Sequence, residues 1–240
     1  MTRIPILYED ERLVVVDKPS GLAVVPAAGE VPGQSVRLCL EQQLGVPVWV
    51  VHRLDRETSG VLLFARTAEA HRLLCAAFEE RRVRKTYLAL TFGVPPRREG
   101  RIDTPLHAAR RGKARPAGPR EPGSIDAFTR YLVRRSWERA GVQVAQLEAY
   151  PETGRHHQIR VHLRSIGTPV LFDRVYGRQS GARGLDGAPA PRLALHASRL
   201  VVPDPSLPDR TLTFDAPLPG DLVAVLRWLD GEWRRRAGAG

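Results

Sequence analysis

Asp55 lies in the segment VHRLDRETSGVLLFA, residues 51–65, where polar side chains crowd into a few positions. Arg53 and Arg56 flank it, and the turn-forming residues 58–60 follow. A carboxylate that a rigid turn holds among arginines is a candidate for general-base or nucleophilic chemistry. On spacing alone, a surface turn with a solvated ion pair explains the same residues equally well.

Two apolar runs, at 48–51 and 61–65, enclose this polar stretch. Short apolar runs bounded by turn residues predict buried strands. Leu54 is the expected apolar anchor of the loop between them. Asp55 is therefore predicted to lie in a polar loop that two core strands support.

The nine residues HRLDRETSG at 52–60 are similar to the HRLDxxTSG signature of RluA-type RNA pseudouridine synthases, and they match it at every fixed position. DKPSGLAVVP at 17–26 resembles the opening motif of that family, and KTYLAL at 85–90 resembles the segment with its active-site tyrosine. TGRHHQIRVHL at 153–163 is similar to its third motif. Further matches are FDRVYG at 172–177 and RLALHASRL at 192–200, so the resemblance covers about residues 6–220.

The resemblance implies an isomerase that converts uridines of large-subunit ribosomal RNA, of transfer RNA, or of both to pseudouridine, without a cofactor or a metal. It implies Asp55 as the carboxylate that attacks C1′ or takes the 2′ proton, and Tyr87 as the residue that stacks on the target base. It also implies Arg160 as the basic partner of Asp55. An arginine within about 4–6 Å lowers the pKa of a carboxylate by roughly 1–3 units, so Arg160 is expected to keep Asp55 ionised. For Tyr87, the pattern alone favours a strand tyrosine in the core.

Residues beside these three are expected to bind the RNA around an everted uridine. His52 and Arg53 would fill the vacated space or hold adjacent phosphates, and Arg155 would contact phosphate. The basic run at 81–85 is also open to interpretation as a solvated helix end. The full set of expected RNA-binding residues is His52, Arg53, Arg56, Arg84, Lys85, Arg155, His157 and Gln158.

The net charge of +11 favours a polyanionic partner, which agrees with structured RNA. Of the 37 basic residues only three are lysine, and the chain has no asparagine, a pattern also typical of a GC-rich genome.

The apolar runs are too short to span a membrane, and the two cysteines favour a reducing cytoplasm without a metal or disulfide framework. Phosphate-binding and dinucleotide-binding glycine motifs do not occur, and we expect a monomer.

The elements predict an α+β fold with a mixed, largely antiparallel sheet flanked by helices. The resemblance adds a pseudouridine synthase catalytic fold with a central RNA-binding cleft, in a single domain over residues 1–240 and without the S4 domain of larger members. Helical periodicity predicts helices at 34–45, 67–80 and about 220–230. Strands are expected at 12–17, 48–51, 61–65, 86–93, 127–133, 142–150, 158–163, 193–202 and 211–215.

Residues 107–124, HAARRGKARPAGPREPGS, are rich in Arg, Gly and Pro and predict an exposed loop. The family has an RNA-gripping loop at about this place, and a disordered linker is the alternative.

Two other classes of function stay open beside the isomerase. One is a catalytically inactive RNA-binding or ribosome-assembly factor of the same fold, which an intact set of Asp55, Tyr87 and Arg160 disfavours. The other is a hydrolase that cuts the N-glycosidic bond and releases the base, because carboxylates serve such reactions too.

Overall fold

The computed structural model describes residues 2–26, 35–108, 113–118, 121–177, 185–189, 192–207 and 209–233. The chain divides into two compact units. Unit 1 comprises Met1–Thr86 and His196–Pro217, and unit 2 comprises Tyr87–Leu195 and Leu218–Gly240. The single domain expected over residues 1–240 stays a prediction.

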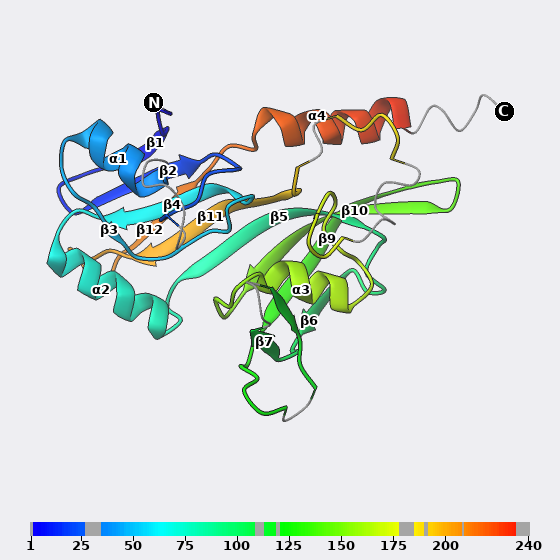
Figure 1. The fold of residues 1–240 in the computed structure, drawn as a ribbon, viewed down its shortest axis with the longest axis horizontal. Coiled ribbons are helices and arrows are strands. Elements are labelled where there is room, and N and C mark those ends of the chain that lie inside the picture. Colours follow the sequence, from blue (N-terminus) through cyan, green and yellow to red (C-terminus); the bar gives the residue numbers. More distant parts are fainter. Residues whose placement is uncertain are drawn as a thin grey trace. The chain divides into compact units, whose positions relative to one another are not determined.

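A mainly antiparallel set of strands forms the centre of unit 1 (Figure 1). β2 pairs with β1 and β4, β3 pairs with β4, and β12 pairs with β11. The one parallel pairing described here joins the start of β4 to His196 and Ala197 of β11. These strands are β1 (Ile6–Glu9), β2 (Leu13–Lys18), β3 (Trp49–Val50), β4 (Ser59–Ala65), β11 (Leu195–Pro203) and β12 (Thr211–Asp215).

The two predicted helices of unit 1 are present, and each begins after a capping residue. α1 (Val36–Leu44) has Ser35 as its N-cap and the left-handed Gly45 as its C-cap. Gln34, the first residue of the predicted helix, lies outside the described residues. α2 (Ala68–Glu79) begins after Thr67, whose side chain accepts a hydrogen bond from the amide of Ala70. Its buried face packs with β2 and β4 in one apolar cluster.

Unit 2 contains a second, antiparallel series of strands, in the order β5–β10–β9–β6. Their apolar faces pack with α4 around a core that includes Leu147, Leu222 and Trp228. The C-terminal helix predicted at about 220–230 is α4 (Gly220–Trp228), followed by a π-helical turn at Leu229–Trp233. The strands are β5 (Arg84–Phe92, whose first three residues belong to unit 1), β6 (Glu99–Ile102), β9 (Thr129–Arg139) and β10 (Val142–Pro151).

The segment QIRVHL at 158–163 was expected as a strand, and this prediction is wrong. It forms the helix α3 (Gln158–Ser165). Residues 158–163 are all buried, polar and apolar side chains alike, so polar residues do not mark an exposed face in this part of the helix. The alternation of Ile159, Val161 and Leu163 with polar residues imitates a strand, whereas the polar side chains are in fact satisfied by hydrogen bonds inside unit 2.

The exposed loop predicted at 107–124 contains more regular structure than its composition indicates. β7 (Leu106–Ala108) and β8 (Ala114–Pro116) form an antiparallel hairpin. Leu106 and Ala114 are buried in a small apolar cluster with Val161 of α3 and Tyr176. Residues 109–112 and 119–120 of the predicted loop lie outside the described residues.

The predicted α+β class is confirmed, because the pairings within each unit are mainly antiparallel and a few helices accompany them. Among the helices described, none combines the length and the apolar character that crossing a membrane requires.

Candidate active site

Asp55 lies in the loop between β3 and β4, as its flanking apolar runs predict. Its side chain is half-buried, whereas Arg53 and Arg56 are exposed. The predicted anchor Leu54 is buried, and so is Thr58, whose amide donates to the Asp55 carbonyl over 3.1 Å. The residues on both sides of Asp55 therefore anchor the backbone that carries its carboxylate.

The segment Lys18–Leu22 holds this loop by its backbone. Lys18 is completely buried, and its Nζ donates to the carbonyl oxygens of Pro19, Leu22 and Arg56 over 2.8, 2.6 and 2.9 Å. The amide of Gly21 donates to the same Arg56 carbonyl over 2.9 Å. Ser20 Oγ donates to the carbonyl of the next loop residue, Glu57, over 2.7 Å. The two motifs at 17–26 and 52–60 are therefore joined directly beside Asp55.

The loop ends at Ser59 and Gly60, the first residues of β4, which pair with β11. Ser59 Oγ lies 2.9 Å from Nδ1 of the buried His196, whose Nε2 lies 3.3 Å from the carbonyl oxygen of Ala216. A carbonyl oxygen only accepts, so Nε2 donates to Ala216, and a neutral ring then accepts the Ser59 proton at Nδ1. His196 thus ties the end of the loop to the segment after β12.

β11 approaches the backbone of β4 closely at Gly60. A Cβ added there would lie 2.1 Å from the Ala197 carbonyl oxygen, and φ is +114°. We expect Gly60→Ala to lower the free energy of unfolding by at least about 3 kcal/mol, because the backbone of β11 has to move and the conformation is strained. Urea unfolding measures this. Gly45→Ala is the matched control, since Gly45 also has a positive φ, +71°, but no heavy atom within 4 Å of an added Cβ. It should cost only about 1 kcal/mol, and equal costs would contradict the close-approach argument.

His52, expected to bind RNA, has a structural environment in unit 1. Its ring stacks on Phe78 with centroids 4.8 Å apart, and its Nε2 accepts the amide proton of Leu63 over 3.1 Å. Burial, and secondly the charge of Lys85, lower the pKa of His52 to about 3. A neutral imidazole carries no charge for a phosphate, so we propose that His52 positions the loop, and a direct contact with RNA stays a prediction.

The depressed pKa of His52 predicts an acid-sensitive fold. The unfolded chain takes up this proton near the ordinary pKa of 6.5, whereas the folded protein takes it up only near 3. Between these values protonation favours the unfolded chain. The contribution of His52 to the free energy of unfolding is therefore fully present above about pH 6.5 and decreases as the pH falls below it. We expect His52→Gln, which keeps an acceptor for Leu63, to remove about 1.4 kcal/mol per pH unit from this slope between pH 6 and 4. Urea unfolding at several pH values measures the slope for each protein. Above pH 7.5 the stability curves of the wild type and the variant should be parallel. Parallel curves between pH 6 and 4 would contradict the lowered pKa of His52.

Lys85 and Tyr87 both lie on β5. The chain passes from unit 1 to unit 2 between Thr86 and Tyr87. Arg84 is exposed, and Lys85 and Tyr87 are half-buried. Burial lowers the pKa of Lys85 to about 8, so its ammonium is still mainly protonated at neutral pH. Tyr87 pairs with Ala149 of β10 and packs partly against the core of unit 2, so both its predicted stacking role and core packing are compatible with its place.

Arg160 is held in a fixed orientation inside unit 2. Its Nε and Nη2 donate to the two carboxylate oxygens of Asp173 over 2.7 and 2.9 Å, and both side chains are buried. Burial raises the pKa of Asp173, but Arg160 and the amides of Tyr176 and Val175 more than offset this and lower it overall. A bidentate pair fixes the plane of the guanidinium, so Arg160 is oriented before any substrate binds.

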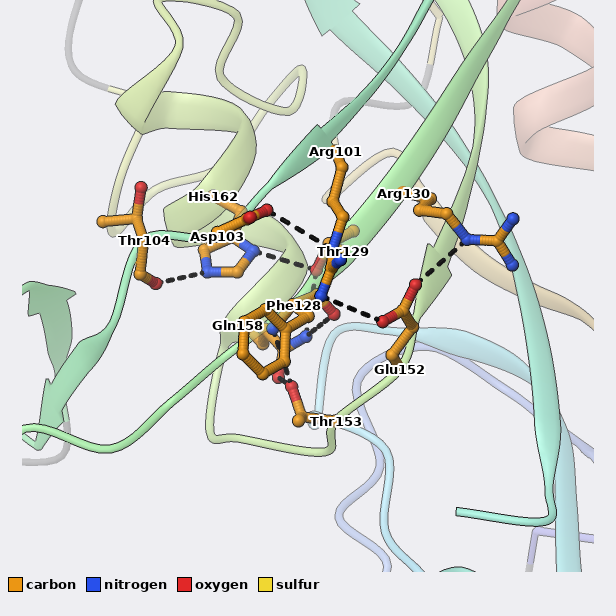
Figure 2. A network of polar contacts seen from close by, with 10 residues as sticks. All are labelled: Arg101, Asp103, Thr104, Phe128, Thr129, Arg130, Glu152, Thr153, Gln158 and His162. Carbon is orange, nitrogen blue, oxygen red and sulfur yellow. Dashed lines mark hydrogen bonds and ion pairs between the residues drawn. The ribbon is translucent and has the colours of Figure 1, made fainter.

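Gln158 and His162 belong to a polar network that joins α3 to β9 (Figure 2). The Gln158 amide nitrogen donates to Phe128 O and Thr129 Oγ1, each over 2.9 Å, and its oxygen accepts from Thr153 Oγ1 and the Arg155 amide. His162 Nε2 donates to the Thr104 carbonyl, so its neutral ring accepts the Thr129 hydroxyl proton at Nδ1. Burial keeps this ring neutral by lowering its pKa.

This network changes the role that we assign to Gln158. Its side-chain amide makes four hydrogen bonds within unit 2 and the residue is buried. We propose that Gln158 positions the start of α3, where Arg155 is exposed and His157 half-buried. RNA contacts by Arg155 and His157 stay predictions.

Ion pairs neutralise part of the arginine content on β6 and β9. Glu152 bridges Arg130, at 3.0 Å, and Arg101, at 3.5 Å, as Figure 2 shows. Arg134 pairs in the same way with Glu148 at 2.7 Å. These paired arginines therefore contribute little to the net charge of +11, which other basic residues carry.

Sequence reasoning assigned no role to several residues that shape this site, although each lies in a segment that resembles a family motif. A lysine that ends an apolar strand immediately before a proline is a signal that could have identified Lys18 as a buried cation. The partners of Arg160 and Ser59 lie 13 and 137 residues away along the chain, and no local pattern connects them. The residues concerned are Lys18, Asp173, Tyr176 and His196.

Comparison with known proteins gives consistent matches. The family described as RNA pseudouridylate synthase matches residues 12–165. The chain is 37% identical over 232 residues to the ribosomal large subunit pseudouridine synthase D of Nitrosomonas europaea, covering 93% of this chain and 64% of that protein. It is 39% identical over 212 residues to the dual-specificity RNA pseudouridine synthase RluA of Escherichia coli, covering 88% of this chain and 92% of that protein. This chain thus spans somewhat less than two thirds of the Nitrosomonas protein.

Among solved structures, the human RNA pseudouridylate synthase domain containing 4 is similar to the fold. The TM-score is 0.75 at 28% identity, over 94% of this chain and 93% of that one.

Proposed function

Because this chain belongs to the RNA pseudouridylate synthase family, we propose that it isomerises specific uridines in structured RNA to pseudouridine. We propose large-subunit ribosomal RNA, transfer RNA, or both as its substrates. The observation that carries the proposal is the Asp55 loop, which matches the family signature and which Lys18 and Gly21 hold by hydrogen bonds to its backbone.

The proposed reaction breaks the bond between ribose C1′ and uracil N1 and rejoins the base through C5. N1 gains a proton and C5 loses one, so no electrons are exchanged with another molecule and the reaction needs no cofactor. We propose that the ionised Asp55 carboxylate attacks C1′ or takes the 2′ proton. Arg160, already oriented by Asp173, would supply the positive charge that keeps Asp55 ionised.

Tyr87 is proposed to stack on the target base and to assist removal of the C5 proton. We expect Tyr87→Phe to keep the ring and the RNA affinity within about threefold, because stacking needs only the aromatic face. Turnover should fall by about 10²-fold or more, as expected when a proton-transfer group is lost. Single-turnover kinetics and a filter-binding assay measure the two quantities. Full activity in this variant would remove Tyr87 from the mechanism.

Basic residues beside the site are proposed to bind the RNA backbone. Arg53, Arg56 and Arg84 are exposed in unit 1, and Lys85 is charged at neutral pH. We further propose that the protein acts in the cytoplasm as a monomer, since its substrates are RNA and its sequence shows no apolar surface stripe.

The test of the proposal is a map of pseudouridines in total RNA from cells with and without this gene. We expect one or more sites to lose the modification in the deletion strain and to regain it when the gene is restored. An unchanged map would contradict the proposal. The relatives are named as synthases, which gives the inactive-factor alternative no support.

A further inference from the structure

Tyr176 connects two segments of unit 2 through a single hydroxyl group. The residue is 4% exposed. Its Oη accepts the amide proton of Ala114, in β8, over 2.8 Å. The same oxygen lies 2.8 Å from Nδ1 of His157, the residue that precedes α3. One buried oxygen atom therefore contacts both the hairpin and the start of the helix.

A backbone amide only donates, so the phenol oxygen accepts from Ala114. The same hydroxyl donates to His157 Nδ1 when a neutral ring carries its hydrogen on Nε2, and it accepts from Nδ1 in the other tautomer. Because the Ala114 amide already occupies one acceptor position of the oxygen, we expect the hydroxyl to favour the Nε2–H tautomer of His157.

The Tyr176 ring extends this connection to Arg160. The guanidinium carbon of Arg160 lies 5.0 Å from the ring centroid, and the His157 ring meets the same phenol edge-on at 5.4 Å. Asp173 ties the arrangement together, because its carboxylate binds Arg160 and accepts the Tyr176 amide proton over 3.0 Å. Moving the phenol would disturb both basic side chains.

Two basic residues at the second strand of the hairpin are exposed. Lys113 is exposed, and Arg115, which pairs with Glu121, is 49% exposed. A segment of this composition suits the phosphates of a polyanion.

We propose that Tyr176 is a positioning residue that couples the basic hairpin β7–β8 to His157 and Arg160, so that RNA held by the hairpin aligns these two side chains. The proposal rests on the proposed function, because it takes RNA as the ligand of the hairpin. Its physical part, the coupling through one hydroxyl, concerns the free protein alone.

The test compares the full-length protein with Tyr176→Phe, which removes only the hydroxyl. In the free variant, the Ala114 amide should exchange with solvent about tenfold faster, because its acceptor is lost. The nitrogen-15 shifts of His157 should show a larger fraction of the Nδ1–H tautomer. On substrate RNA, kcat should fall by about 10- to 100-fold through misalignment. Amides in the middle of β9 and β10 should keep their protection, which shows that the variant is folded.

Tyr150→Phe is the matched control, because it removes a hydroxyl of the same unit that binds Glu148 instead. It should leave the Ala114 exchange rate, the His157 tautomer and kcat unchanged. An unchanged exchange rate or an unchanged tautomer in Tyr176→Phe would overturn the coupling, and a wild-type kcat would overturn its role in alignment. Absence of pseudouridine with the wild-type protein would instead overturn the proposed function, and the two measurements on free protein would still decide the coupling.

Discussion

Asp55→Asn should abolish pseudouridine formation while the protein still binds RNA. The amide is close in size to the carboxylate, but it is neutral and neither attacks C1′ nor accepts the 2′ proton effectively. Loss of a nucleophile or base of this kind costs about 10⁴-fold or more in kcat. RNA affinity should stay the same or rise slightly, because a negative charge near phosphates is removed. Single-turnover kinetics with excess enzyme measure the chemical step apart from binding.

Glu57→Gln is the matched control for this experiment. Glu57 lies two residues further along the same loop, is exposed, and also loses one negative charge on substitution. Its turnover should stay within about threefold of the wild type, as expected for a surface substitution. If Asp55→Asn retained the parental rate, or if both variants lost activity equally, the role of Asp55 would be refuted.

Lys18→Met should have the second largest effect, on stability and activity together. The ammonium is buried and donates to three carbonyl oxygens, and methionine leaves these acceptors without that donor. Each loss costs about 1–3 kcal/mol, so we expect the free energy of unfolding to fall by at least about 3 kcal/mol. Because one of the acceptors is the Arg56 carbonyl, next to Asp55, kcat should also fall by about 10²-fold in the protein that remains folded.

Urea unfolding measures the first effect, and kinetics at a temperature where the variant is fully folded measure the second. Lys113→Met is the control, since Lys113 is an exposed lysine and its loss should change stability by less than about 0.5 kcal/mol. A Lys18→Met protein as stable as this control would show that the three hydrogen bonds do not stabilise the fold.

Local signals predicted much of the fold. α2 begins after the N-cap Thr67 because a hydroxyl cap and an apolar period of 3.6 both mark this place. β4 and the loop before it were predicted because a buried run borders turn residues, and Leu54 was predicted as the anchor for the same reason. α2 buries one face, so its sequence carries the helical period, whereas β4 is buried at all seven positions and is marked by its continuous apolar run.

Where polar and apolar residues are buried together, the sequence loses that information. α3 was taken for a strand because its polar residues at 158, 160 and 162 alternate with apolar ones, and their partners lie elsewhere in unit 2. Composition misled in a different way at 107–124. There Ala114 is buried in one apolar cluster with Leu106, just before the segment, and with Tyr176, which follows Ala114 by 62 residues. The matching motifs indicated the site residues by resemblance, but the hydrogen bonds of Lys18 and the ion pair of Asp173 required the structure.

The most direct measurement of the central claim uses RNA whose uridines carry tritium at C5, incubated with the purified protein. Isomerisation replaces this hydrogen with the bond to C1′, so we predict tritium release into water in step with pseudouridine formation, and no free uracil. Release of uracil would identify a hydrolase. RNA that keeps all of its tritium, under conditions where the protein binds it, would contradict the proposed function.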